Sequence, residues 1–247
     1  MEERAVNSTV TVTLGTKHFA EANEIVREAF ALTDEVEIDQ AFAQRYLGCA
    51  MAAGKRLEIH GTPGNDMACY MDGGSIEVFG NAQDQIGNTM NAGEVVVHGR
   101  CGDAAGYAMR GGANFVRDDC GWRVGINMKQ YQDKVPAIVI GGNAGNFLGE
   151  YMAGGVIVLM GQPGEYLACG MHGGIIFLAS CPDERLIAEG LVCEPITEEG
   201  KALLRPLLEQ YNAHLAEDLE APIDESGETF WELRPATARP YASMYAN

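Results

Sequence analysis

The sequence predicts a mainly β fold, a single-stranded right-handed β-helix of about seven coils with about 19 residues each. The first observation is a methionine that recurs at spacings of 20, 19, 19, 19, 24 and 19 residues. The second is a set of glycine columns in the same register, and the third is a pair of apolar columns. A repeat of this length is typical of a solenoid, in which each coil stacks on the next around one shared core. The repeated methionines are Met51, Met71, Met90, Met109, Met128, Met152 and Met171.

Glycine holds fixed positions around each methionine. One column follows the methionines by three residues, a second precedes them by three, and a third lies farther along each coil. A coil this short must turn several times, and corners with positive φ are open to glycine without steric cost. The columns therefore predict glycine corners between short strands. They comprise Gly54, Gly74, Gly93, Gly112, Gly155 and Gly174; Gly48, Gly87, Gly106, Gly125 and Gly149 with Ala68 and Ala168; and Gly61, Gly80, Gly99, Gly142 and Gly161.

Two apolar columns lie two residues apart in every repeat. Side chains at this spacing on a strand point to one face, so each repeat predicts a strand with its apolar face in the core. Asn114 interrupts the first column, and we expect it to be buried and hydrogen-bonded. We expect the methionines to pack in the same core, because the unbranched thioether adapts to irregular space. The columns are Leu57, Ile76, Val95, Asn114, Ile138, Ile157 and Ile176, and Ile59, Val78, Val97, Val116, Ile140, Leu159 and Leu178.

The segments that flank the repeats predict a division into three parts: an α/β cap at 1–46, the β-helix at 47–180 and an extension at 181–247. In the first part, residues 9–14 alternate as in a strand, 16–34 carry apolar residues at helical spacing, and 35–38 lead into the first coil. Open solenoid ends need such a cap, because otherwise their cores would meet water.

The C-terminal extension predicts a helix followed by a tail. The helix spans Thr197 to Leu219, with Thr197 as its N-cap and two glutamates in its first turn. Pro206 lies inside it and predicts either a kink or two shorter helices. Residues 221–247 hold three prolines and several aromatic residues, and we expect an extended arm.

The charge balance excludes several classes of partner. The chain has 17 basic and 35 acidic residues, a formal charge of −18, so it lacks a basic surface for nucleic acid or anionic membranes. Residues 1–4 are acidic and lack the layout of a secretory signal, and no stretch is long and apolar enough to span a membrane. Asn7 begins a glycosylation pattern without any sign that it is used. Seven cysteines without a CxxC pair favour the reducing cytoplasm over a disulfide or metal framework.

The sequence predicts no catalytic, cofactor-binding or metal-binding residue. The glycine-rich stretch 141–149 lacks the lysine and the following helix of a phosphate loop. His60 and His98 share a column with Phe79 between them, and all five histidines lack ligand spacing. Two cysteine pairs, Cys49 with Cys69 and Cys101 with Cys120, lie in adjacent coils, where we favour small apolar fillers over disulfides. We interpret one cluster of charged residues as a solvated face or a protein interface. It comprises Arg110, Arg117, Asp118, Asp119 and Arg123.

Several stretches resemble the GXGXG domain that closes the large subunit of glutamate synthase. They are 44–48, 61–67, 80–90, 106–112 and 149–155, and together they extend the resemblance over most of residues 5–180. One of the subunits of formylmethanofuran dehydrogenase has a similar domain, and stand-alone proteins similar to the glutamate synthase alpha subunit resemble the chain more closely. Ala43 stands where glycine is expected, and the match beyond Ser180 is loose.

The resemblance implies a non-catalytic assembly subunit of a glutamate synthase-type oxidoreductase complex. Its partners would be a glutaminase-type subunit and an FMN and iron–sulfur synthase subunit, and both cofactors would belong to that second partner. A similar scaffold in another oxidoreductase, such as formylmethanofuran dehydrogenase, is the first alternative, and a free-standing enzyme is the second. Whether the isolated chain forms homo-oligomers, and which face docks partners, stays open.

Overall fold

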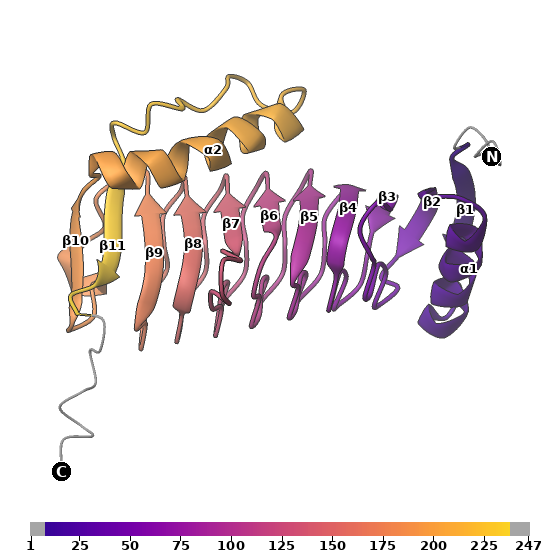
Figure 1. The fold of residues 1–247 in the computed structure, drawn as a ribbon, viewed down its shortest axis with the longest axis horizontal. Coiled ribbons are helices and arrows are strands. Elements are labelled where there is room, and N and C mark those ends of the chain that lie inside the picture. Colours follow the sequence, from indigo (N-terminus) through magenta and orange to yellow (C-terminus); the bar gives the residue numbers. More distant parts are fainter. Residues whose placement is uncertain (1–7, 238–247) are drawn as a thin grey trace, which may run out of the picture.

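The computed structural model describes residues 8–237, and the predictions about residues 1–4 and about Asn7 fall outside them. Within this range, eleven strands form one sheet in the order β1-β2-β3-β4-β5-β6-β7-β8-β9-β11-β10. Figure 1 shows them as a long row of rungs with a helix near each end. The bounds of the strands from β1 to β9 are Val10–Gly15, Glu35–Phe42, Arg56–Thr62, Asp72–Phe79, Ala92–Val97, Ala113–Val116, Ala137–Ile140, Ala153–Leu159 and Gly173–Leu178.

The strands pair in the register that the sequence predicts. Leu57 lies opposite Ile76, Ile76 opposite Val95, and Val95 opposite Asn114, and the column continues to Ile176. All these pairings are parallel, and the paired residues of both columns are fully buried. The predicted β-helix is therefore confirmed as a β-solenoid. It begins earlier than expected, because β2 already pairs with β3 and places Val36 opposite Leu57, which gives about eight turns.

Each coil returns through a bend in which every second residue has positive φ. In one coil these residues are Gln85, Gly87 and Thr89, with φ of 60°, 65° and 54°. Only the middle position of the three belongs to a glycine column. At the other two positions, residues with ordinary side chains adopt the left-handed conformation. Hydrogen bonds between coils enforce it, since Gln85 and Thr89 donate to the following coil at 2.8 Å each. Ala43, where glycine was expected, also has a positive φ of 61°.

The core is continuous from the first coil to the last. The methionines of the repeat are at most 5 % exposed, as predicted, and pack against both apolar columns. At the N-terminal end, α1 (Phe19–Leu32) connects β1 to β2 and buries Ala22, Val26 and Ala29. This arrangement covers the apolar end of the first coil.

The C-terminal extension closes the other end of the sheet. After the 3₁₀ helix η1 (Glu184–Leu186), β10 (Leu191–Pro195) leads into α2 (Glu198–Leu215), whose N-cap is Thr197 as predicted. Pro206 lies inside α2, which runs as one helix.

The tail differs from the expected extended arm. Part of it forms β11 (Trp231–Pro235), which pairs antiparallel with both β9 and β10. The rest of the predicted arm, residues 238–247, lies outside the described chain. Among the described helices, none has both the length and the apolar character needed to cross a membrane.

Candidate functional site

The outer face of the sheet is divided into an apolar part and a polar part. From Val96 of β5 onward its central column is apolar and packs against α2, which lies across this part of the sheet (Figure 1). Leu204, Leu208, Tyr211 and Leu215 supply the helix side of this contact and are fully buried. On the sheet side the buried residues are Val96, Phe115, Val139, Val156, Val158 and Phe177. Helix α2 thus forms a second, smaller core outside the solenoid.

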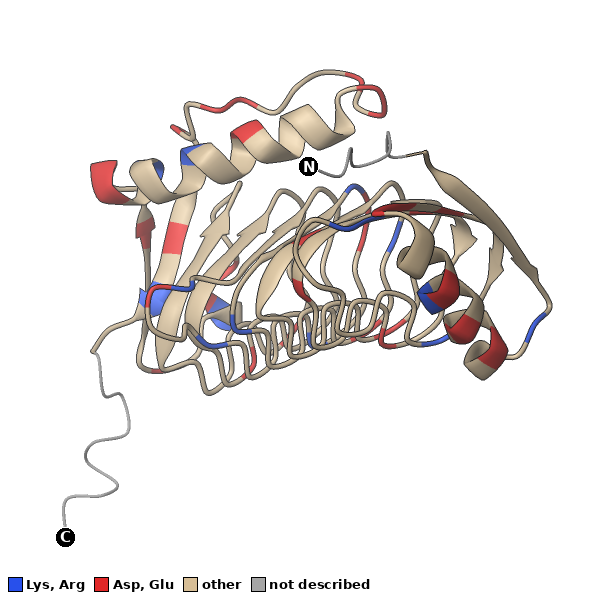
Figure 2. Ribbon diagram, turned by 45° about the vertical axis from the view of Figure 1, so that its right-hand side comes forward, with Lys and Arg blue, Asp and Glu red and all other residues tan. Residues whose placement is uncertain are grey.

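The other part of the outer face, over β2 to β4, carries charged side chains, and neither of the described α-helices covers it. We call it the open polar face. Its central column is acidic, because Glu37, Glu58 and Glu77 lie opposite one another on successive strands. Figure 2 shows further acidic residues on α1 and in the loop after α2. The open polar face therefore presents side chains that can pair with a basic surface.

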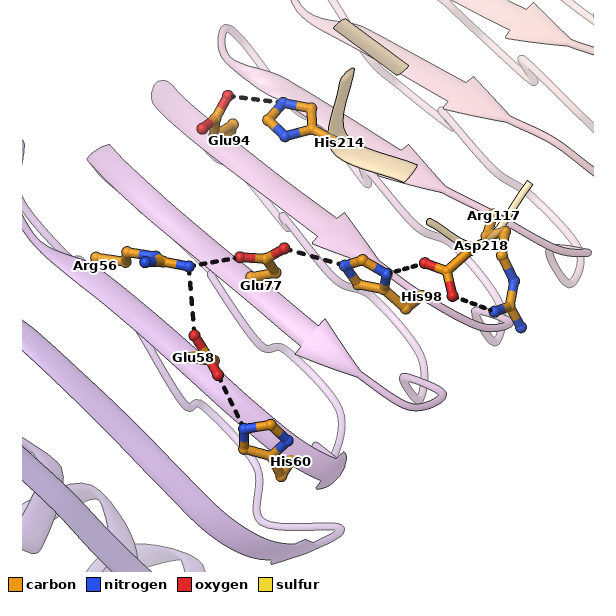
Figure 3. A network of polar contacts seen from close by, with 9 residues as sticks. All are labelled: Arg56, Glu58, His60, Glu77, Glu94, His98, Arg117, His214 and Asp218. Carbon is orange, nitrogen blue, oxygen red and sulfur yellow. Dashed lines mark hydrogen bonds and ion pairs between the residues drawn. The ribbon is translucent and has the colours of Figure 1, made fainter. Parts of the chain in front are cut away.

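A chain of ion pairs crosses the open polar face and reaches α2 (Figure 3). Arg56 bonds Glu77 at 2.9 Å and Glu58 at 3.3 Å. The other oxygen of Glu77 lies 3.1 Å from Nε2 of His98.

His98 continues this chain, since its Nδ1 contacts a carboxylate oxygen of Asp218, in the turn after α2. The second oxygen of Asp218 accepts from Arg117 at 3.2 Å, at the end of β6. Residues from β3, β4, β5, β6 and the end of α2 are thereby joined.

Aromatic rings stack along the edge of the same face. The ring of Phe79 lies between His60 and His98, with centroid distances of 5.1 and 4.5 Å and interplanar angles of 12° and 20°. The sequence predicted this shared column. Phe79 is 39 % exposed, so one edge of the stack meets solvent.

A separate ion pair joins α2 to β5. Nε2 of His214 lies 3.4 Å from Glu94, and both side chains are partly buried. The hydrogen bond with Glu94 raises the pKa of His214, and the same contact lowers the pKa of Glu94. On the open polar face, the hydrogen bond to Glu77 likewise raises the pKa of Arg56. These shifts arise from complementary charges that hold elements together.

One group on the open polar face has metal-ligand atoms close together. Oxygens of Glu37 and Glu58 and a nitrogen of His60 lie within 4.8 Å of one another. Nε2 of His60 is 2.9 Å from Glu58 and 3.6 Å from Glu37. Arg56 pairs with Glu58 at 3.3 Å, so one of the two carboxylates already has a positive partner within the chain. We assign no metal to this group. That the chain has no metal-binding residue stays a prediction.

The structure separates the residues of the predicted charge cluster. Arg117 bonds Asp118 at 2.9 Å and Asp218, so it belongs to the ion pairs at α2. Asp119 accepts the backbone N–H of Asn143 in the next coil at 2.7 Å. Arg123 pairs with Glu150 at 3.0 Å in the bend and lies over the ring of Phe147. Arg110 is exposed. The five residues therefore serve different contacts and form no single site.

The remaining sequence candidates also have structural explanations. Cys101 and Cys120 face each other in adjacent coils as free, buried thiols, and burial raises the pKa of Cys101. Cys49 and Cys69 are free as well. In the stretch 141–149, Gly141 lies where a Cβ would be 1.9 Å from the hydroxyl of Tyr211. Close packing of α2 explains this glycine.

Reasoning from the sequence missed the division of the outer face, although the sequence carries the signal for it. Between the two inward columns lies an outward one, which reads Glu37, Glu58, Glu77 and then Val96. It stays apolar afterwards, at Phe115, Val139, Val158 and Phe177. A strand column that is apolar on both faces predicts a cover on its outer side. The change from Glu77 to Val96 in the outward column thus marks where the contact of α2 with the sheet ends.

The stacked coils, their glycine corners and the helix-covered outer face define a β-solenoid protein. The chain belongs to the GXGXG motif family, which matches residues 33–236. It is 34 % identical to the uncharacterized protein MJ1350 of Methanocaldococcus jannaschii, over 92 % of this chain and 93 % of that protein.

A solved structure shares the fold. It is the crystal structure of the formyltransferase/hydrolase complex (FhcABCD) from Methylorubrum extorquens in complex with methylofuran. The match has a TM-score of 0.63 and 22 % identity, and it covers 74 % of this chain and 69 % of the chain in that complex. The resemblance to this domain type that the sequence predicted is therefore confirmed.

Proposed function

We propose that this protein is a non-catalytic structural subunit of a multi-subunit enzyme. The observation that carries the proposal is the division of the outer face, since one part is covered by the chain itself and the other is left open and acidic. An acidic surface of this kind suits docking of a basic partner surface. The formal charge of −18 would keep the subunit soluble before it docks.

The stacked coils support a scaffold role mechanically. Every coil is hydrogen-bonded to its neighbours, and the buried core is continuous along the stack. A body of this kind bends little, because close-packed interiors resist deformation. It would hold two partner subunits at a fixed separation, as transfer of an intermediate between two active sites requires.

Two kinds of assembly are candidates for the enzyme. The fold match to a chain of a formyltransferase/hydrolase complex favours an assembly related to that complex or to formylmethanofuran dehydrogenase. The glycine-cornered stretches at 61–67 and 80–90 favour instead a glutamate synthase-type assembly, with glutaminase-type and FMN and iron–sulfur subunits. We place the first ahead, because a whole-fold comparison supports it in addition to sequence.

The isolated chain tests the non-catalytic part of the proposal. We expect it to have flat visible absorbance, less than stoichiometric metal, and neither glutaminase nor glutamate synthase activity. A flavin spectrum, stoichiometric iron, or glutaminase activity that a surface substitution abolishes would overturn the scaffold role.

Recovery of the tagged chain from its native host, followed by mass spectrometry, distinguishes the assemblies. Formyltransferase- or hydrolase-type partners support the first candidate, whereas glutaminase-type and FMN-synthase-type partners support the second. We expect the complex to be sensitive to salt, because screening weakens contacts between exposed charges. Recovery of the chain alone, or with partners unrelated to either assembly, would contradict the proposal.

A further inference from the structure

The bend of the first coil presents backbone groups that later coils use for hydrogen bonds. In the second coil, the N–H groups of Ala68 and Asp72 donate to the preceding coil at 2.9 Å each. In the third, Gly87 and Asn91 do the same at 2.9 and 2.8 Å. In the first coil the corresponding residues are Gly48 and Ala52, and no bend precedes this coil. Their N–H groups have no hydrogen-bond partner within residues 8–237.

The carbonyl groups of this edge follow the same pattern. Arg45 and Cys49 hold the positions whose oxygens accept from the preceding coil elsewhere in the stack. The amide of Asn23, on α1, donates to the carbonyl of Arg45 at 2.8 Å and so satisfies one of them. The carbonyl of Cys49 has no such donor in the described part of the chain. The N–H groups of Gly48 and Ala52 and, between them in the chain, the carbonyl of Cys49 therefore have no hydrogen-bond partner along this edge within the described residues.

A pocket of about 570 Å³ lies between this edge and α1. Its walls come from both elements. Val26 and Phe30 of α1 and Met51 of the coil supply apolar surface, while Gly48, Cys49 and Ala52 belong to the unpaired edge. A pocket of this size is large enough for a small organic molecule, whose apolar body would lie against α1.

The charge of the pocket is opposite to that of the protein. Arg27 and Lys55 line it, and no lining residue is acidic, although acidic residues outnumber basic ones two to one in the chain. The carbonyl of Phe30 accepts from Nζ of Lys55 at 3.0 Å and fixes the ammonium beside the pocket. Asp34, which does not line the pocket, lies 3.8 Å from the same nitrogen. Unpaired N–H groups together with two cations form a site for an anion.

We propose that this pocket binds a small organic carboxylate that carries an N–H donor beside the carboxylate and an apolar body. The carboxylate accepts from the free backbone N–H groups and pairs with Arg27 or Lys55. The N–H of the ligand donates to the carbonyl of Cys49, and the apolar body packs on Val26 and Phe30. The site is independent of the open polar face and of the proposed scaffold role.

The test uses hippurate, which has a carboxylate, an amide N–H and a phenyl ring, and its neutral amide, hippuramide. The full chain is labelled with ¹³C at the methionine methyl groups, and the Met51 signal is assigned with Met51→Leu. We expect hippurate to shift the Met51 signal to saturation, and hippuramide to bind about tenfold more weakly because it lacks the charge. Arg27→Gln and Lys55→Met should each weaken hippurate binding by roughly fivefold to tenfold.

Arg45→Gln is the matched control, because its exposed guanidinium lies near Tyr46 and does not line the pocket. This variant should bind hippurate as the original chain does. Since Lys55→Met also removes a contact to α1, Arg27→Gln supplies the cleaner measurement, and thermal midpoints verify that both variants fold. A Met51 signal that does not respond to hippurate, equal affinity for hippuramide, or equal weakening by Arg45→Gln would overturn the proposal.

Discussion

At the scale of single residues, the fit between glycine and isoleucine controls how closely the coils stack. A Cβ on Gly106 would lie 2.4 Å from Cδ1 of Ile138, and Gly125 and Gly149 face isoleucines in the same way. Alanine occurs in this glycine column at Ala68, whose place in the register faces the shorter Val95. At these positions glycine therefore faces the longer isoleucine, and alanine faces the shorter valine.

Gly106→Val should lower the free energy of unfolding by about 2–4 kcal/mol, as measured by chemical denaturation. The backbone there has a φ of 69°, and the new side chain would overlap Ile138. Gly54→Ala is the control for backbone strain alone, because Gly54 has a φ of 82° and nothing within 4 Å of its Cβ position.

Ile138→Val should recover part of the loss caused by Gly106→Ala, because it recreates the combination of Ala68 and Val95. Losses that simply add in the double variant would show that the overlap with Ile138 is not the cause.

At Asn114 the expectation of a buried, hydrogen-bonded side chain is confirmed only in part. It is fully buried as predicted, but its carbonyl oxygen has no hydrogen-bond partner among residues 8–237, and its amide contacts the sulfur of Met109 at 3.8 Å. Its neighbours in the column are aliphatic, so the polar group is desolvated with little compensation.

Asn114→Val should therefore raise the free energy of unfolding by about 1–2 kcal/mol in chemical denaturation. Val95 shows that valine fits the preceding position of the column. Ile138→Val, in the next coil, is the control and should lower stability by about 1 kcal/mol through lost packing. A less stable Asn114→Val variant would mean that the asparagine makes a stabilising contact in solution.

At the scale of elements, the docking of α2 depends on apolar packing and on a titratable pair. The hydroxyl of Tyr211 donates to the carbonyl of Arg117 at 3.2 Å, and burial raises the pKa of this tyrosine. His214, one turn further along the helix, adds a partly exposed ion pair with Glu94 of β5.

The stabilisation from this pair should be greatest between about pH 4.5 and 6.5, the ordinary pKa values of its two groups. The lowered pKa of Glu94 gives stability above its ordinary value that is lost as the pH falls through the folded-state value. The raised pKa of His214 gives stability below its ordinary value that is lost as the pH rises through the folded-state value.

Comparison of His214→Gln with the original chain measures this contribution. The difference in unfolding free energy should be on the order of 0.5 kcal/mol near pH 5.5 and smaller near pH 8.5, since the pair is partly exposed. A difference that grows toward pH 8.5 would contradict the pairing of His214 with Glu94.

Elements with local signals could be predicted, and those defined by distant pairing could not. The strands of the repeats follow from the apolar columns, and α2 follows from Thr197 and the helical spacing after it. Strand β11 escaped prediction, because its place depends on antiparallel pairing with β9, more than 50 residues earlier in the chain. The open polar face was missed for another reason, since only the two inward columns were followed and the outward column between them was not.

At the scale of the whole molecule, the solenoid is closed differently at its two ends. Helix α1 covers the first coil, while β11 and β10 extend the sheet beyond β9. Between these ends, α2 covers the apolar part of the outer face and leaves the open polar face free (Figure 1). A stiff body with one uncovered acidic face is what the proposed scaffold role needs.

The most direct test of this account compares what three tagged chains recover from the native host. One is the original chain, the second carries Glu37→Gln, Glu58→Gln and Glu77→Gln on the open polar face, and the third carries Glu165→Gln, Glu184→Gln and Glu189→Gln at exposed positions elsewhere. Both variants lose three charges, so net charge is matched. We predict that the original chain and the third recover the same partner subunits, and that the second loses them while still unfolding in a single cooperative thermal transition. Equal recovery of partners by all three chains would contradict docking through the open polar face.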